Sequence, residues 1–337
     1  MINFLRMLTQ MGMMFNDTPE IGSAILAVNL IFISLGVVTL LLIVIPVLSL
    51  LVVKNKIIRK LAMVLIVLFS VILLSQIGLY AYMAYIEPNQ IKVEEVNLKI
   101  PGLGNVLQGK RIVQFSDLHV RQFGTKEKRL IKIINSLNPD IILFTGGFTG
   151  EEKERLGEAM PQAAKIFSSL KAKIGIWAVT DDTDDLMFIE KPYLKEELVK
   201  AGVKLLFNTS EKIYTSQDGY FWLIGTEDAF YGNNGLPEAT FMIPLREPKI
   251  IITHSPNAVD YMQDYKVDLV LAGKTHGGQI GLKVFATLSN YIAKFKYLRG
   301  LYKMRDTYLY VNRGIGGKTI NLRLFCPPEV TVFNITD

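Results

Sequence analysis

The chain contains three histidines, and each lies in a short segment typical of a metal-binding loop. His119 stands two residues after Asp117, His254 follows a short apolar run, and His276 lies in the glycine-rich segment 273–279. Two imidazoles and a carboxylate can hold one zinc, iron or manganese ion with open coordination positions. Asp117 and the three histidines His119, His254 and His276 therefore suggest a metal site.

The segments that carry these residues follow the pattern of an α/β fold. Short apolar runs predict buried strands, and amphipathic stretches between them predict helices. The candidate loops follow the strands, and in open α/β sheets such loops converge on one crevice, so residues far apart in sequence are expected to share a site. The strands are expected at 111–115, 140–144, 175–179, 249–253 and 268–272, and the helices at 125–137, 152–170 and 191–201.

The order of the polar segments resembles that of the calcineurin-like metallophosphoesterases, especially the membrane-associated branch that includes UDP-diacylglucosamine pyrophosphatases. The family pattern is Asp-x-His, Gly-Asp, Gly-Asn-His-Asp, a lone His and then Gly-His-x-His, and the chain follows this order within residues 109–337. Segments 310–314 (Tyr-Val-Asn-Arg-Gly) and 328–329 (Pro-Glu) also look like those of the family. The resemblance implies an α/β/β/α sandwich of two mixed sheets flanked by helices.

By this resemblance, the first metal ion of the family would be held by Asp117, His119 and His276. The bridging aspartate that completes this set in the family maps to Gly147. A bridging carboxylate both ligates and neutralises two cations, and glycine does neither. A standard dinuclear site is therefore not expected.

The second metal ion of the family maps to Asp182, His254 and Lys274, of which only His254 is unaltered. Lys274 would repel a cation, and it is expected to contact phosphate together with His254 or to pair with Asp182. Thr183 replaces the family's general-acid histidine, and a threonine hydroxyl cannot act as an acid near neutral pH. No catalytic residue is therefore assigned, and Gly147, Asp182, Thr183 and Lys274 are degenerate positions.

Two interpretations of the ligand set remain open. Asp117, His119 and His276 could retain one Mn, Zn or Fe ion, or their imidazoles could be relics that are satisfied by hydrogen bonds. The acidic run 181–185 could supply further oxygen ligands. Because clustered like charges usually stay solvated, a hydrated surface loop is expected there, with Asp182 as the one candidate ligand.

Two long segments, 21–53 and 61–86, carry no charged side chain and are long enough to span a hydrocarbon layer of roughly 30 Å. The link between them, 54–60, carries four positive charges and is therefore expected to be cytoplasmic. This topology predicts a multi-pass protein of the cell membrane, with its C-terminal domain on the extracytoplasmic side. Residues 1–20 are expected to form an interfacial segment or a frayed tail.

The remainder is expected to form a linker over 87–108 and one phosphoesterase-like domain over 109–337. Within it, 281–305 contains six bases, no acid and several interspersed aromatics. Residues 283–305 predict a surface for anionic lipid head groups, or else a solvated helical face whose aromatics point inward. Binding to nucleic acid is not expected.

Two functional hypotheses follow. In the first, the chain is a membrane-anchored pseudoenzyme with an eroded dinuclear site, which binds a phosphate-bearing lipid or a partner protein. In the second, it is a mononuclear metal-dependent hydrolase of phosphoester or pyrophosphate bonds at the membrane surface. A role in a larger membrane assembly, with a membrane protein partner or as a homo-oligomer, is compatible with both.

Overall fold

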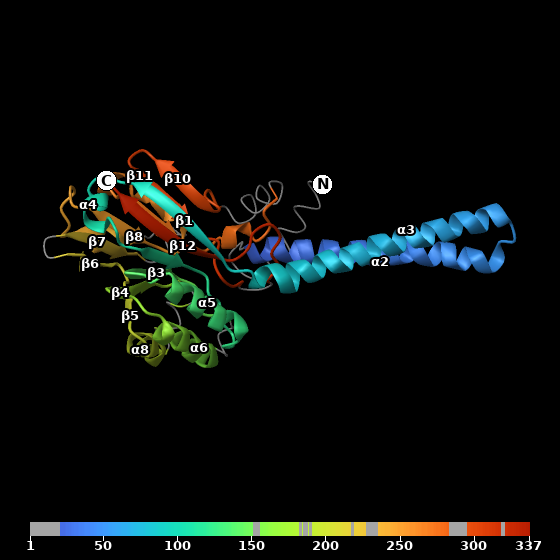
Figure 1. Cartoon of the computed structure of the whole chain (residues 1–337), viewed down its shortest axis with the longest axis horizontal. Helices are drawn as coiled ribbons and strands as arrows, with labels where there is room; N and C mark the ends of the chain where they lie inside the picture. The colour runs from blue at the N-terminus through green and yellow to red at the C-terminus, as the bar shows by residue number, and fades with distance from the viewer. Residues whose placement is uncertain are drawn as a thin grey trace.

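The computed structural model describes residues 21–150, 156–181, 184, 188, 191–216, 219–226, 235–282, 295–317 and 321–337. In this part of the chain, a hairpin of two long helices extends away from a domain built on two β-sheets (Figure 1). The interfacial segment expected at 1–20 lies outside the described residues.

The hairpin consists of α2 (Ile21–Val52) and α3 (Lys56–Ala81), which pack side by side. By length and composition, both helices could cross a membrane. Asn55 caps α3 by accepting hydrogen bonds from the backbone amides of Ile57 and Ile58. The helix therefore begins inside the basic link 54–60. Nearer the domain, the Tyr80 hydroxyl donates to Asn29 Oδ1 at 2.9 Å and joins the two helices.

The first sheet has the strand order β1-β12-β2-β3-β4-β5 among the described residues. Its neighbouring strands are parallel except for β12 and β2, which are antiparallel. The central strands β2 and β3 are buried along their whole length, as expected for parallel strands covered on both faces. The strands are β1 (Lys92–Lys99), β12 (Glu329–Thr336), β2 (Ile112–Phe115), β3 (Ile141–Thr145), β4 (Gly175–Val179) and β5 (Val203–Leu205).

The second sheet has the order β10-β11-β9-β8-β7-β6 in the described part of the chain. Its four inner strands are parallel, and its two edge strands pair antiparallel with their neighbours. Both sheets are therefore mixed. The strands are β10 (Gly300–Met304), β11 (Thr307–Val311), β9 (Leu269–Ala272), β8 (Lys249–Ile252), β7 (Tyr220–Gly225) and β6 (Thr209–Tyr214).

Hydrophobic side chains from both sheets pack against each other and form the central core of the domain; they include Leu143, Trp177, Phe221 and Ile250. Helices cover the outer faces. The first sheet is covered by α5 (Thr125–Ser136), α6 (Leu156–Ser169) and α8 (Pro192–Lys200). The second is covered more thinly, by α9 (Leu236–Thr240) and the 3-10 helices η5 (Pro256–Tyr261) and η6 (Gln263–Tyr265).

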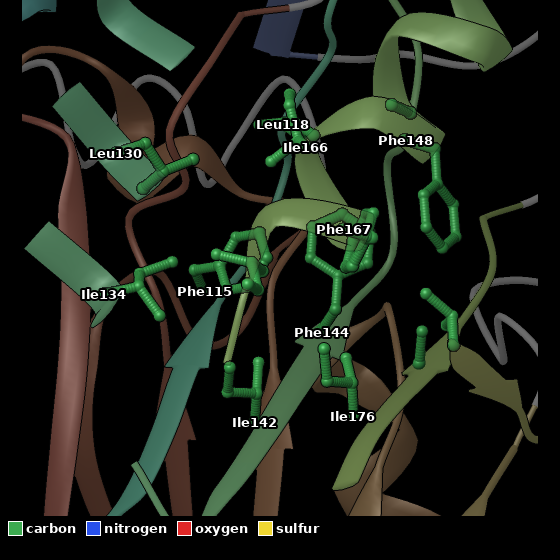
Figure 2. Packing of buried hydrophobic residues seen from close by; sticks show 14 of the residues in the cluster. Phe115, Leu118, Leu130, Ile134, Ile142, Phe144, Phe148, Ile166, Phe167 and Ile176 are labelled. Carbon is green, nitrogen blue, oxygen red and sulfur yellow. The ribbon is translucent and has the colours of Figure 1, made fainter. Parts of the chain in front are cut away.

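Aromatic side chains fill the layer between the first sheet and its helices. Figure 2 shows Phe115 and Phe144 on the strands facing Phe167 on α6, with Phe148 beside them. The ring centroid of Phe144 lies 4.6 Å from that of Phe148 and 5.2 Å from that of Phe167, and both distances are within the range of favourable aromatic pairs. The loops after β2 and β3 start from this rigid layer.

The expected α/β/β/α sandwich of two mixed sheets is confirmed, preceded by an apolar helix pair. The structure differs from the expectation at 87–108, which was assigned to a linker. This segment contains η2 (Glu87–Asn89), strand β1 and α4 (Leu103–Leu107). Because β1 is a largely exposed edge strand with charged side chains, it lacks the apolar run that marks a buried strand.

The fold makes a quantitative prediction about the aromatic layer. Phe144→Ala removes a fully buried ring from the contacts in Figure 2, so we expect it to lower the free energy of unfolding by about 3–5 kcal/mol. Guanidinium titration followed by tryptophan fluorescence would measure the change. The matched control is Phe241→Ala, because Phe241 is 83% exposed and its removal should change stability by only about 0.5 kcal/mol or less. Equal effects of the two substitutions would contradict the packing described.

Candidate metal centre

The candidate residues lie just beyond the carboxyl ends of the inner strands. Asp117 and His119 follow β2, Gly147 follows β3, His254 follows β8, and His276 follows β9 in the 3-10 helix η7 (His276–Gly278). The two sheets thus contribute to the same end of the sandwich. The predicted convergence of these loops is what the structure shows.

Three imidazoles surround one carboxylate oxygen. The Nε2 atoms of His119 and His276 each lie 3.7 Å from Asp117 Oδ1, and Nε2 of His254 lies 3.9 Å from the same atom. The ligand atoms of Asp117, His119 and His276 all lie within 4.8 Å of one another, and all three residues are buried. Two ligands of a tetrahedral zinc ion, each at about 2.0–2.2 Å, stand roughly 3.4 Å apart, so the two distances of 3.7 Å from Asp117 Oδ1 are close to the spacing that one ion requires.

Backbone carbonyls fix the orientation of all three imidazoles. The Nδ1 atoms of His119, His254 and His276 lie 3.0 Å, 2.7 Å and 3.3 Å from the carbonyl oxygens of Thr149, Thr145 and Gly316, respectively. A carbonyl oxygen only accepts, so each neutral ring must carry its proton on Nδ1. Each Nε2 then presents a lone pair toward Asp117, which is the tautomer that a metal ligand needs.

The carboxylate of Asp117 is buried, and its surroundings favour the ionised form. Burial alone would raise the pKa of Asp117, but the attraction of the His276, His119 and His254 imidazoles in their protonated form outweighs burial and holds the pKa well below its usual range. The backbone amide of Lys274 donates to both carboxylate oxygens, at 3.2 and 3.0 Å. A buried negative charge of this kind is stable only when it is paired, and a cation among the imidazoles would pair it.

The imidazole of His276 is held neutral. Burial lowers its pKa to about 3, and the neighbouring His119 and Arg323 act in the same direction, against the attraction of Asp117. Metal ligands must be deprotonated to bind. His276 is therefore ready to coordinate at neutral and at mildly acidic pH, and this chemistry fits the metal that the ligand set suggests.

The backbone adopts the left-handed region at the ligands themselves. The φ angles are 48° at Asp117, 41° at His119, 69° at Lys274 and 47° at His276. A non-glycine residue in this region costs energy, of order 1–3 kcal/mol, and persists only where the surrounding structure requires it. Such residues cluster at functional sites, and their concentration in these loops supports the same assignment.

Gly147 lies beside Asp117 and His119. A Cβ atom built at Gly147 would lie 3.0 Å from Asp117 Cα and 3.3 Å from the His119 ring, so a side chain at this position would point toward the ligands. The position fits the bridging aspartate implied by the resemblance, but the glycine leaves it without a carboxylate. Its φ of 81° suits glycine, and among other residues aspartate is one of the better tolerated.

The acidic run 181–185 contains the predicted site residues Asp182 and Thr183. Asp182 and Thr183 lie outside the described residues. The acidic run was expected to be a hydrated surface loop, and this was wrong for Asp181 and Asp184, which are 5% and 1% exposed. Asp184 accepts from the backbone amides of Phe148 and Asp181, and these hydrogen bonds stabilise its burial beside the loop that carries Gly147.

The basic segment 283–305 is described only from residue 295 onward. Within that part, Lys296 pairs with Asp260 at 3.0 Å. Arg299 donates to the carbonyl oxygens of Gly277 and Gly281, close behind His276. These two bases therefore support local structure, and Arg299 ties the segment to the candidate metal centre.

Sequence reasoning missed the groups that hold the ligands in place. The acceptors of the imidazole protons are main-chain atoms, and they leave no signal in the sequence. Arg323 was also missed, although a lone arginine between Leu322 and Leu324 is the kind of pattern that can mark a buried guanidinium. Arg323 is 0% exposed and donates to carbonyl oxygens of the loop that carries Gly316.

Together, the sandwich and the buried aspartate with its three imidazoles define an α/β protein of the phosphoesterase type with a possible metal site. No family model matches the chain. The metallophosphoesterase YkuE of Bacillus subtilis (strain 168) is 30% identical over 261 residues, which are 77% of this chain and 90% of the relative. The chain belongs to the metallophosphoesterase family, within a membrane-associated, calcineurin-like group.

Two other relatives carry more specific names. The UDP-2,3-diacylglucosamine pyrophosphatase LpxG of Chlamydia muridarum (strain MoPn / Nigg) is 27% identical over 305 residues, covering 74% of this chain and 90% of LpxG. A transmembrane protein with a metallophosphoesterase domain from Danio rerio is 28% identical over 255 residues, covering 71% of this chain and 56% of that protein. Together with the apolar helix pair, these relatives indicate that the chain is membrane-associated.

The low pKa of His276 predicts how stability depends on pH. The unfolded chain takes up a proton near pH 6.5 and the folded state only near pH 3, so protonation of this residue favours unfolding as the pH falls between these values. The contribution is present above pH 6.5 and declines by about 1.4 kcal/mol per pH unit below it. We therefore expect the midpoint temperature of thermal unfolding of chelator-treated protein to decrease as the pH is lowered from 7 to 4.5.

In the His276→Gln variant, this pH dependence should be shallower, because the variant lacks the group whose pKa differs between the folded and the unfolded chain. The lowered pKa of Asp117 lies below the pH window and does not contribute within it. Differential scanning calorimetry in detergent would compare the two proteins. Parallel pH profiles for the wild type and His276→Gln would contradict the assignment.

Proposed function

We propose that the chain is a membrane-anchored phosphoesterase-fold protein that binds one divalent metal ion and uses this site to hold a phosphate-bearing lipid without hydrolysing it. Asp117, His119 and His276 would hold the ion. The observation that carries the proposal is the convergence of three oriented Nε2 atoms on Asp117 Oδ1. Hydrogen bonds of the imidazoles to main-chain carbonyls would satisfy a relic site as well, but such a site would not require three Nε2 atoms to face one buried carboxylate oxygen.

The absence of hydrolysis is proposed from the degenerate positions. Position 147 faces the ligands and offers no carboxylate, so a second cation would lack its bridge. Lys274, whose amide contacts Asp117, brings an ammonium into the loop where the family has a further histidine. Thr183 cannot protonate a leaving group near neutral pH. The site can attract phosphate, but it lacks the groups for a two-metal reaction with acid catalysis.

His254 favours a second candidate function, that of a mononuclear phosphoester or pyrophosphate hydrolase. Its Nε2 faces Asp117 Oδ1 like those of the two proposed ligands, so it could ligate the ion or contact a phosphate together with Lys274. When bound, a metal ion of this kind supplies positive charge and lowers the pKa of a bound water. In this second function, such a water would react without a protein acid.

The lipid character of the ligand is proposed from the membrane association. LpxG is named for a substrate that carries acyl chains and a pyrophosphate, and this chain covers 90% of its length. We further propose that both apolar helices span the cell membrane with the link 54–60 in the cytoplasm, so that the domain is extracytoplasmic. We also propose that residues 283–305 bind anionic lipid head groups. A further proposal is that the chain binds a partner protein or forms a homo-oligomer.

Metal content is the direct test of the ligand set. After loading with manganese or zinc and desalting, the wild type should retain close to one ion per chain by mass spectrometry. His119→Ala and Asp117→Asn should retain almost none, because each removes one of three ligands. The matched control is Asp264→Asn, an exposed aspartate in η6 that should leave the metal content unchanged. Wild-type protein without metal would refute the metal-binding proposal.

Turnover separates the two candidate functions. We expect metal-loaded wild type to release no nitrophenol from bis(p-nitrophenyl) phosphate above the rate of His119→Ala. A variant with Gly147→Asp, Asp182→Asn, Thr183→His and Lys274→His should gain activity by at least about a hundredfold, since it restores a bridge, two ligands and an acid, and the acid alone contributes roughly 10²-fold or more.

The control for this restoration is the same variant without Gly147→Asp. It should stay inactive, because the bridging carboxylate is still missing. Metal-dependent turnover by the wild type, abolished in His119→Ala, would replace the pseudoenzyme proposal with the mononuclear hydrolase.

A further inference from the structure

The end of the second apolar helix is bonded to a segment of the domain. Beyond α3 the chain continues through η1 (Tyr82–Ile86) to Glu87, which is only 3% exposed. The Glu87 carboxylate accepts from the backbone amides of Phe325 at 3.0 Å and Cys326 at 2.6 Å. The carbonyl oxygen of Met83 accepts from the amide of Arg323 at 2.9 Å. Hydrogen bonds thus tie segment 323–326 to the helix end.

Apolar packing reinforces this connection from both helices. Val28 of α2 and Met83 share one buried cluster with residues of the domain. The domain side of the cluster is formed by Leu322 and Leu324, which flank Arg323, and by Ile280, which forms a β-bridge with Leu324. The hairpin is therefore packed onto the segment that runs beside the loop of His276.

Arg323 carries the connection toward the metal centre. Its guanidinium is fully buried, and Nη2 donates to the carbonyl oxygens of Arg313, Gly314 and Gly316 at 3.0, 3.1 and 2.9 Å. Among the described residues, the hydrogen-bond acceptors of this guanidinium are main-chain carbonyls and not carboxylates. Burying a guanidinium without an ion pair raises the free energy of the folded state. The burial of Arg323, which holds one loop, therefore calls for a structural explanation.

The loop that Arg323 holds is the support of the site. The amide of Gly316 donates to the carbonyl of Asp117, and the amide of Ile315 donates to that of Ser116. The carbonyl oxygen of Gly316, which accepts from Arg323, lies 3.3 Å from His276 Nδ1. One main-chain oxygen therefore contacts both the buried guanidinium and a candidate metal ligand.

The imidazoles of His119 and His254 are oriented by carbonyl oxygens from another part of the chain. His119 and His254 use the carbonyls of Thr149 and Thr145, which belong to β3 and the loop after it. In the described part of the chain, neither carbonyl accepts a hydrogen bond from segment 323–326. Of the three imidazoles, that of His276 therefore shares its carbonyl acceptor with a side chain of segment 323–326.

We propose that Glu87 and Arg323 are positioning residues that connect the end of the second apolar helix to His276, so that the membrane hairpin forms part of the scaffold of the metal centre. A displacement of the helix end relative to the domain would move the Gly316 carbonyl and change the orientation of one ligand. The consequence for metal affinity rests on the proposed metal binding, whereas the connection to His276 does not.

The test uses full-length protein in lipid bilayers, labelled with ¹⁵N-histidine and free of metal. The chain has three histidines, so solid-state NMR should resolve their ring nitrogens, and His276→Gln would assign the relevant pair. The variants are Glu87→Gln, which loses one of the two acceptor oxygens, and Arg323→Lys, which keeps the charge but not the fork of donors. Glu87→Asp is a milder second variant that keeps the carboxylate. Glu95→Gln, an exposed carboxylate on β1, is the matched control.

We expect Glu87→Gln and Arg323→Lys to shift the His276 nitrogens toward a mixture of tautomers and to leave those of His254 unchanged. Glu87→Asp should produce a smaller shift of the same kind. Cys326 is the sole cysteine and is buried, so its rate of alkylation in the folded protein should rise at least about tenfold in Glu87→Gln. Substitution of groups that support metal ligands typically weakens metal binding by roughly 10–100-fold, and we expect this range for both variants.

Unchanged His276 resonances in Glu87→Gln and Arg323→Lys would overturn the proposal. So would an equal displacement of all three histidines, because this would indicate a general loss of structure and not a specific connection. Failure of the wild type to bind metal would instead refute the proposed function, since the resonances of the metal-free protein are measured independently.

Discussion

The structure of the site depends on one buried negative charge. The carboxylate of Asp117 lies at the end of β2 with no exposed surface, and its near neighbours are imidazole nitrogens and a backbone amide. The folded chain must stabilise this charge, and the left-handed backbone at Asp117, His119 and His276 is part of the arrangement that does so. Loops from both sheets meet at this carboxylate, because each places an imidazole or a backbone amide beside it.

The sandwich supplies the rigidity that this arrangement needs. Parallel strands that are buried on both faces fix where each loop begins, and the aromatic layer around Phe144 holds β2 and β3 against α6 (Figure 2). The loops then run side by side, with the amide of His119 donating to the carbonyl of Gly147. Ligands that are distant in sequence therefore reach a common point without a long flexible loop.

Much of this arrangement could be predicted from the sequence. Strands such as Ile141–Thr145 are continuous apolar runs, and the ligand types of Asp117, His119 and His276 indicate their chemistry directly. The edge strand β1 was missed because its exposed, charged residues resemble those of a linker. The burial of Asp184 was missed because composition shows like charges but not the backbone amides that satisfy them. The role of Arg323 depends on carbonyl oxygens, which every residue has, so no residue type could reveal it.

The orientation of the imidazoles by main-chain carbonyls also bears on how the site responds to mutation. The acceptors at Thr145, Thr149 and Gly316 remain when the side chains at these positions change, provided that the path of the backbone is kept. A carboxylate in the same role could be lost by a single nucleotide change, whereas a carbonyl cannot. The orientation of the three imidazoles can therefore persist when the side chains around them change.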